Sequence, residues 1–243
     1  MAGHSKWNNI KNRKGAQDAK RGKIFQKLSR EIYMAAKEGG PDPEMNPSLR
    51  LAMDKAKSNN MPNDNVERAI KKATSAGEGE NYDEVIYEGF GPSGVAILTH
   101  TLTDNRNRTF TNVRVAYNKN GGNLGETGTV NYMFDRKGYF VIERDKCELD
   151  EETILMMALE AGAEDLETSE EVFEIYSEPT EFSAVRNDLE AQGVSFHTAE
   201  LTMVPKTMVG LSAEDYEILE TILDALEDDD DVSEVFHNGE LAQ

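Results

Sequence analysis

The sequence predicts an α+β multidomain protein with an N-terminal three-helix bundle, an α+β middle domain, and a ferredoxin-like βαββαβ domain inserted in it. Three observations lead to this prediction. Apolar residues recur with a helical period up to about residue 75 and with a period of two beyond residue 80. The polar, glycine-containing segment 75–80 between them is typical of a linker. Residues 139–204 then alternate strand and helix patterns in the βαββαβ order.

The bundle is predicted from three apolar stripes at helical spacing. The first stripe ends at Gly39–Gly40, which Pro41 follows, as at many helix ends. Asn46 before Pro47 predicts the start of the second helix. The spacing of Asp64 and Glu67 predicts a capping box at the start of the third. The stripes are Ile24, Leu28 and Ile32; Leu49, Ala52, Met53 and Ala56; and Val66, Ile70 and Ala73.

The middle domain is predicted to begin with strands 82–88 and 95–103, joined by a turn at 89–94 with glycines at positive φ. A polar loop, 104–109, leads into a helix, and a strand is expected over 130–134. The inward-facing residues of that helix are expected to be Phe110, Val113 and Tyr117.

The inserted domain is predicted to hold two helices. The first, 150–161, is expected to bury Ile154, Leu155, Ala158 and Leu159. The second is expected over 180–192. The predicted strands are 139–143, 163–168, 172–177 and one within 194–205; a helix, 211–227, and an edge strand, 232–237, return to the middle domain. The predicted domains are 1–78 (basic arm and helical bundle), 79–135 with 206–243 (α+β domain), and 136–205 (inserted ferredoxin-like domain).

Charge is strongly segregated along the chain. The formal net charge is −20, yet residues 1–75 carry +8 and residues 76–243 carry −28. Nine of the first thirty residues are Lys or Arg, and one is acidic. A basic segment on an acidic protein predicts a polyanionic partner, and the acidic remainder is expected to face solvent or a protein partner. The expected nucleic-acid-binding residues are Lys6, Lys11, Arg13, Lys14, Lys20, Arg21, Lys23, Lys27, Arg30, Arg106 and Arg108.

Residues 3–21 show little periodicity and predict an extended or loosely ordered arm whose cations follow a phosphate backbone without reading sequence. Trp7 is a candidate for stacking on an exposed base. The alternative is that the arm lies on the protein's own acidic surface, with Trp7 as a hydrophobic anchor. For Arg106 and Arg108, the alternative to phosphate contact is a helix cap at Asp104 or Asn105 with surface arginines.

Catalytic, metal and cofactor motifs are missing from the sequence. The four histidines are scattered, with no HExxH or paired ligand spacing. Cys147 is the single cysteine, which excludes an internal disulfide and suits a reducing cytosol. The glycine-rich stretch 121–128 lacks the GxxxxGK[ST] pattern of a phosphate-binding loop. We expect no enzyme activity, cofactor or metal, no membrane span or secretory signal, and a cytoplasmic location.

Several motifs occur in one order along the chain: Ala2-Gly3-His4-Ser5-Lys6-Trp7, Asn60-Met61-Pro62, Tyr87-Glu88-Gly89 and Thr103-Asp104-Asn105. With these motifs the chain resembles the YebC-type family of probable transcriptional regulatory proteins over essentially its whole length. The resemblance implies the same three domains and a cytoplasmic, non-enzymatic, nucleic-acid-associated regulator. A mitochondrial relative acts as a translational activator of cytochrome c oxidase, and bacterial members have been linked to stalled ribosomes.

The first hypothesis is therefore a transcriptional regulator that binds DNA through the arm and bundle. The second is a ribosome-associated translation factor that binds ribosomal RNA through the same residues and relieves stalling. No helix shows an obvious base-reading row, which disfavours a highly specific operator binder. A third hypothesis, an enzyme, would need a site in the inserted domain, whose acids have no base or metal set beside them.

Overall fold

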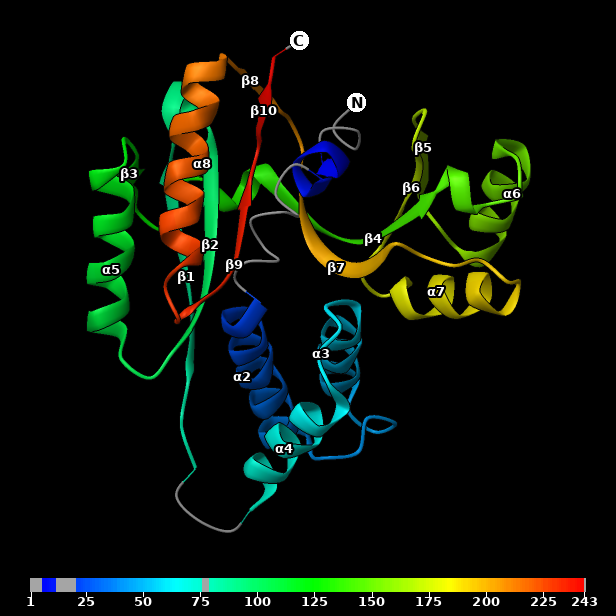
Figure 1. The fold of residues 1–243 in the computed structure, drawn as a ribbon, viewed down its shortest axis with the longest axis horizontal. Coiled ribbons are helices and arrows are strands. Elements are labelled where there is room, and N and C mark those ends of the chain that lie inside the picture. Colours follow the sequence, from blue (N-terminus) through cyan, green and yellow to red (C-terminus); the bar gives the residue numbers. More distant parts are fainter. Residues whose placement is uncertain (1–5, 12–20, 76–78, 243) are drawn as a thin grey trace. The chain divides into compact units, whose positions relative to one another are not determined.

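The computed structural model describes residues 6–11, 21–75 and 79–242 and shows a mixed α+β protein, as predicted (Figure 1). The described residues form two compact units. The inserted unit comprises Phe134–Lys206 together with residues 6–11, and the main unit comprises the other described residues up to Met133 and from Thr207 onward. The finer division into three domains stays a prediction.

Helices α2 (Arg21–Gly39), α3 (Pro47–Ser58) and α4 (Asn63–Thr74) pack together as a helical bundle within the main unit. Their apolar stripes bury Leu28, Ile32, Leu49 and Val66 in a common core. Asn46 caps α3 as predicted, because its side chain accepts a hydrogen bond from the backbone N–H of Leu49 at 3.1 Å.

The predicted capping box of α4 is wrong. The N-cap is Pro62, which offers no side-chain hydrogen bond, and Asp64 already lies in the first turn. There its carboxylate faces the positive end of the helix dipole, which explains an acid at this position without a cap.

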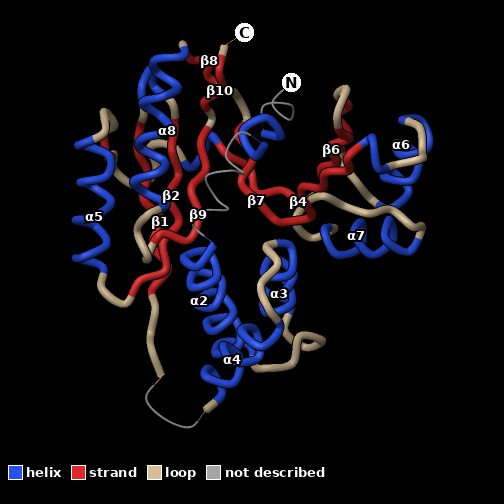
Figure 2. Tube along the Cα trace, viewed as in Figure 1, coloured by secondary structure: helices blue, strands red, loops and turns tan. Residues whose placement is uncertain are grey.

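The main unit also contains a four-stranded antiparallel sheet in the order β3-β1-β2-β9. Figure 2 shows its strands β1, β2 and β9 in red beside helix α8. β9 is an edge strand, as predicted. Helices α5 and α8 pack with Val95, Ile97 and Val232 into one core. A short parallel pair, β8 with β10, was not predicted. The bounds are β1 (Asp83–Phe90), β2 (Ala96–Thr103), α5 (Arg106–Lys119), β3 (Asn123–Leu124), β8 (Val209–Leu211), α8 (Ala213–Glu227), β9 (Val232–His237) and β10 (Gly239–Leu241).

Two expectations for this sheet need correction. Gly94 has the expected positive φ of 77°, but Gly89 lies within β1, where a Cβ would come within 2.5 Å of the Tyr117 ring. Gly89 therefore serves close packing rather than a turn. Phe110 is 45% exposed although Val113 and Tyr117 are buried as expected.

The inserted unit has the element order βαββαβ and a four-stranded antiparallel sheet in the order β5-β6-β4-β7. The predicted strand 130–134 is wrong: residues 131–133 form a 3-10 turn, and β4 begins at Phe134. The bounds are β4 (Phe134–Glu143), α6 (Glu151–Ala161), β5 (Asp165–Thr168), β6 (Val172–Ser177), α7 (Phe182–Ala191) and β7 (Thr198–Pro205).

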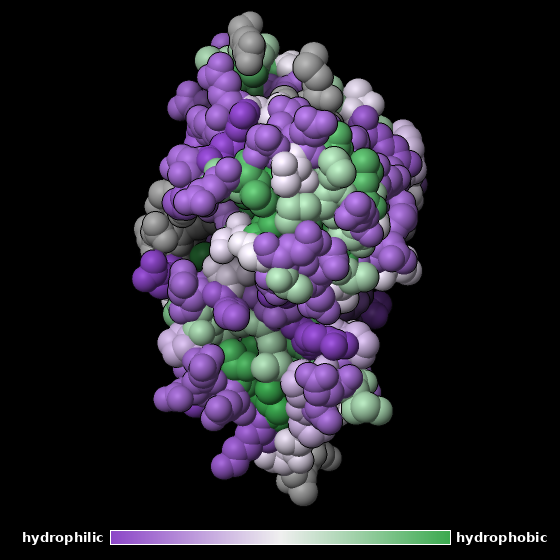
Figure 3. Space-filling view, turned by 90° about the vertical axis from the view of Figure 1, so that its right-hand side faces the viewer, coloured by the Kyte–Doolittle hydropathy of each residue, from purple (hydrophilic) through white to green (hydrophobic). Residues whose placement is uncertain are grey.

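Helix α6 buries a narrower face than predicted. Ile154 and Ala158 are buried, whereas Leu155 and Leu159 are 38% and 53% exposed, as is Met156 at 57%. Residues at i and i+4 share one line along a helix, so Leu155 and Leu159 lie about 100° round from the buried line. Figure 3 shows the side of the molecule on which α6 lies, where hydrophobic surface is framed by hydrophilic side chains.

Within the described ranges, no helix is long and apolar enough to cross a membrane. Over the same residues, no three His, Cys, Asp or Glu side chains are grouped so that they could hold a metal ion.

Candidate nucleic-acid interface

Helix α2 presents Lys23, Lys27 and Arg30 on one face, at i, i+4 and i+7. All three contact the acidic segment 227–231 at the end of α8. Lys23 Nζ lies 2.7 Å from Asp228 Oδ1, and Lys27 Nζ donates to the Glu227 carbonyl. Carbonyls at a helix C-terminus carry partial negative charge, so this face of α2 neutralises both them and the acids.

The pKa values of the two lysines shift in opposite directions. The hydrogen bond to Asp228 raises the pKa of Lys23, which stays at the surface. Burial lowers the pKa of Lys27, and the neighbouring acid Glu227 only partly opposes this shift. Lys27 is therefore held in the protein, and Lys23 is the more accessible of the two.

Asp231 joins two of the expected binding residues. Its Oδ1 accepts from Arg30 at 3.0 Å, and its Oδ2 accepts from Arg108 Nη2 at 2.6 Å and from Thr109 at 2.8 Å. The Asp231 side chain is 4% exposed. Burial by itself would raise its pKa, but the hydrogen bonds from Arg108, Thr109 and Arg30 outweigh burial and lower it.

The start of α5 has the helix cap at Asn105 that was the alternative to phosphate contact for Arg106 and Arg108. Asn105 accepts from the Arg108 backbone N–H at 3.0 Å. Arg108 also pairs with Asp104 at 2.7 Å, and Arg106 pairs with Asp83 at 2.8 Å, both at the surface.

Residues 6–11 are helical, so the expectation of an extended arm is wrong for this part. Trp7 is 7% exposed and clusters with Tyr139, Val141 and Tyr176 of the inserted unit. Ile10 packs against the same cluster, and its spacing from Trp7 gives the short helix one apolar face. The position of Trp7 is that of a hydrophobic anchor rather than of an exposed stacking platform.

The two lysines of this short helix also contact the inserted unit. Lys6 Nζ donates to Thr202 at 3.0 Å and lies 5.0 Å from the centre of the Tyr139 ring. Lys11 pairs with Glu171 at 2.7 Å. Of the other expected binding residues, Arg13, Lys14 and Lys20 lie outside the described residues, and Arg21 is exposed at the first position of α2.

The expected binding residues did not include the Lys and Arg side chains that the structure leaves available for a polyanion. Arg50 and Lys57 on α3, and Arg68 and Lys71 on α4, are exposed. Across the described ranges, none of these four side chains makes an ion pair or hydrogen bond. Their spacings, i and i+7 on α3 and i and i+3 on α4, were a readable signal that each pair shares a helix face.

Family models match nearly the whole chain. The model described as the TACO1/YebC protein N-terminal domain matches residues 5–76, and that of the TACO1/YebC second and third domain matches residues 82–239. The chain belongs to the TACO1/YebC family. The gap between the two matches, residues 77–81, overlaps the predicted linker 75–80.

Two similar bacterial proteins and one solved structure support this membership. A probable transcriptional regulatory protein of Enterococcus faecalis is 69% identical over 240 residues, covering 99% of each chain. One of Listeria monocytogenes is 60% identical over 241 residues, covering 99% of this chain and 100% of the relative. The crystal structure of a conserved hypothetical protein from Aquifex aeolicus is similar with a TM-score of 0.80, 47% identity and 93% coverage of each chain.

Proposed function

We propose that this TACO1/YebC protein is a cytoplasmic, non-enzymatic regulator of gene expression that binds DNA through its basic arm and helical bundle. The observation that carries the proposal is the set of bundle cations that are exposed and have no acidic partner among the described residues, in a chain of net charge −20. Self-pairing would be the default in so acidic a protein, so cations left unpaired in this part of the chain, and gathered on two helices, favour an external polyanion. The names of the bacterial relatives support a role in transcription.

The expected binding residues differ in how readily they can turn to phosphate. Lys11, Lys23 and Arg106 form exposed ion pairs, which contribute little to stability, so phosphate can replace their carboxylates. Arg30 is 16% exposed and is bound to a carboxylate that is 4% exposed. We therefore rank Arg50, Lys57, Arg68 and Lys71 first, the exposed pairs second and Arg30 last.

The second candidate is a ribosome-associated translation factor that binds ribosomal RNA and relieves stalling. The available cations lie on two helices, and both carry acids among them, such as Asp54 and Glu67. Such a pattern favours phosphate contacts over base reading, and RNA offers phosphates as DNA does. In either case the acidic inserted domain is free to face solvent or a protein partner.

The deciding experiment crosslinks the protein to nucleic acid in cells and sequences what is bound. The test variant is Arg68→Ala/Lys71→Ala. The matched control is Arg114→Ala/Lys119→Ala, which removes the same two residue types from exposed positions on α5, where the described structure shows them without ion pairs. Promoter DNA lost only in the test variant supports the first candidate, and ribosomal RNA lost only there supports the second. Equal recovery from all three proteins would refute the proposal.

A salt series with a mixed-sequence DNA duplex measures the same contacts in solution. Each phosphate contact contributes about −0.9 to the slope of log K against log salt. The test variant should lose about two units of slope, and the control should keep the wild-type value. Deleting the whole arm is a poorer test because it also removes the Trp7 anchor.

A further inference from the structure

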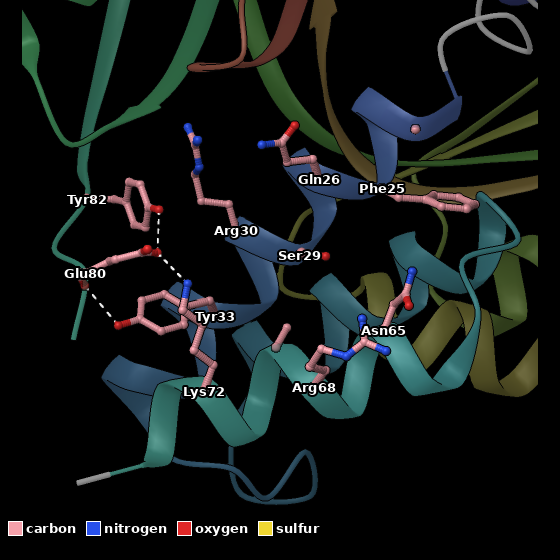
Figure 4. Close-up of a pocket in the computed structure, with 12 residues that line it drawn as sticks. Phe25, Gln26, Ser29, Arg30, Tyr33, Asn65, Arg68, Lys72, Glu80 and Tyr82 are labelled. Carbon is pink, nitrogen blue, oxygen red and sulfur yellow. Dashed lines mark hydrogen bonds and ion pairs between the residues drawn. The ribbon is translucent and has the colours of Figure 1, made fainter. Parts of the chain in front are cut away.

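A pocket of about 540 Å³ lies in the main unit between α2, α4 and the segment that leads into β1 (Figure 4). Its size is within the range of small-ligand sites, roughly 300–1,000 Å³. Helix α2 forms one wall, α4 forms the floor, and Glu80 with Tyr82 closes one end. It adjoins the α4 cations of the proposed interface, because Arg68 lines it.

Aromatic rings lie at both ends of this pocket. Tyr82, half-buried, stands at one end and Phe25, half-buried, at the other. The Tyr82 ring is held in place: it meets Tyr33 edge-on at 6.1 Å, and its hydroxyl donates to Glu80 at 2.7 Å. Arg30 lies 4.7 Å from the Tyr82 ring centre. A flat ligand that stacks on the fixed Tyr82 ring orders little additional side chain, so the entropic cost is small.

Neutral polar side chains lie between the rings. Gln26 and Ser29 on α2 and Asn65 on α4 all line the pocket. In the described structure, the side chains of these three residues make no hydrogen bond with the protein. Amide groups both donate and accept, which is the hydrogen-bonding character of a nucleobase edge.

The charge of the lining matches a ligand with one negative charge. Arg30 is already paired with Asp231, and Arg68 and Lys72 are opposed by Glu80, which leaves a formal charge of +1. Lys72 pairs with Glu80 at 2.9 Å, but both side chains are at least half exposed, so this pair yields readily. Arg68 shows no ion pair in the described structure and is the available phosphate donor.

We propose that this pocket receives one unpaired nucleotide of a nucleic-acid strand, with its base stacked against Tyr82 or Phe25 and its phosphate on Arg68. The inference rests on the nucleic-acid binding proposed above and adds what is bound. Stacking needs an exposed base face, which a paired duplex lacks and a bulge, loop or single strand supplies. One phosphodiester carries one negative charge, in keeping with the lining.

The test compares three DNA probes by fluorescence anisotropy with the full-length protein. They are a paired duplex, the same duplex with one bulged nucleotide, and the same duplex with an abasic bulge; an RNA set is run in parallel. The wild type should bind the bulged probe about tenfold more tightly than the paired and abasic probes, the size of effect expected of one stacked base. Tyr82→Leu/Phe25→Leu should lose this preference but keep its affinity for the paired duplex.

The matched control is Tyr132→Leu/Phe110→Leu, which removes the same two rings from sites that are 63% and 45% exposed. This control should keep the tenfold preference. A crosslink from 5-iodouridine in the bulge to Tyr82 or Phe25 of the wild-type protein would locate the base without relying on a variant.

Three outcomes would overturn the inference. Equal affinity for paired, bulged and abasic probes, with salt-dependent binding intact, refutes the pocket and leaves the proposed function standing. No binding of any probe refutes both. Binding of a free nucleoside monophosphate that is sensitive to Tyr82→Leu, without preference for a bulge, assigns the pocket to a free nucleotide instead of a strand.

Discussion

The indole Nε1 of Trp7 donates a hydrogen bond to Glu171 Oε2 at 2.9 Å, across 164 residues of sequence. The same carboxylate accepts from Lys11, and the hydrogen bonds from Lys11 and Trp7 lower its pKa. A segment whose charge favours a polyanion is thus fastened to an acidic residue of its own chain. Part of the positive charge of the arm is neutralised at the surface by an acid of the same chain.

Because Trp7 is the only tryptophan, its fluorescence reports directly on this attachment. Glu171→Ala should increase acrylamide quenching of Trp7, since the hydrogen bond that holds its indole and an exposed ion pair are lost. Glu170→Ala is the control, because this neighbour is exposed and its side chain makes no hydrogen bond or ion pair with the described residues. Quenching as strong in the wild type as in free tryptophan would contradict the attachment.

Asp231→Asn should destabilise the main unit by about 2–3 kcal/mol, because it leaves Arg30 and Arg108 without their shared buried carboxylate. The value lies below that of a fully buried pair since the Arg108 side chain is 44% exposed. Asp230→Asn is the control, because only the backbone carbonyl of exposed Asp230 contacts Arg30. Urea unfolding measures both variants, and equal stabilities would show that the carboxylate is not needed.

Glu88→Gln should make the stability of the main unit less dependent on pH. The Glu88 carboxylate accepts from the backbone N–H groups of Gly128, Val130 and Asn131 at 2.7, 2.7 and 2.8 Å. Burial would raise its pKa, but these hydrogen bonds lower it below the ordinary value of 4.5. A lowered pKa stabilises the fold above about pH 4.5, and this contribution is lost as the pH falls through the folded-state pKa.

The stability gap between wild type and Glu88→Gln should therefore be about 1–3 kcal/mol at pH 7 and should shrink in acid. Urea unfolding at several pH values between 3 and 7 gives this gap. A stability difference that grew as the pH fell would contradict a lowered pKa of Glu88. The Glu88 carboxylate therefore already accepts hydrogen bonds from the backbone N–H groups at and just after the end of the glycine-rich stretch 121–128.

Lys55→Met should destabilise the main unit by about 3 kcal/mol. Lys55 lies between Glu31 at 2.9 Å and Glu234 at 3.1 Å, and so joins α2, α3 and β9. Burial raises the pKa of Glu31 even with Lys55 present, so removing the lysine leaves two uncompensated carboxylates. Lys57→Met on the same helix is the control, since that lysine is exposed and unpaired within the described structure. Thermal unfolding that does not separate the two variants would contradict the role of Lys55.

Much of the local structure was readable from the sequence. The Asn46-Pro47 cap and the strand Val172–Ser177 were predicted at the observed positions. Both depend on neighbouring residues: a cap on a side chain within three residues, a strand on its β-branched and aromatic residues and flanking turns. The prediction failed where the burial of a side chain depends on which element packs against it. The exposure of Leu155 and Leu159 depends on what covers α6, which its own stripe of apolar residues does not reveal.

For the candidate site, too, the sequence could not show which residues come into contact in the folded protein. The sequence alone is enough to show that the cations are concentrated in residues 1–75 and that the chain resembles the YebC-type family. Which of these cations are available depends on how the chain folds. Lys23 and Asp228 are 205 residues apart in sequence and 2.7 Å apart in space, whereas Arg68 shows no ion pair among the described residues. Composition counts charges, but Coulomb pairing acts over a few ångströms, so availability is settled by the distances that folding creates.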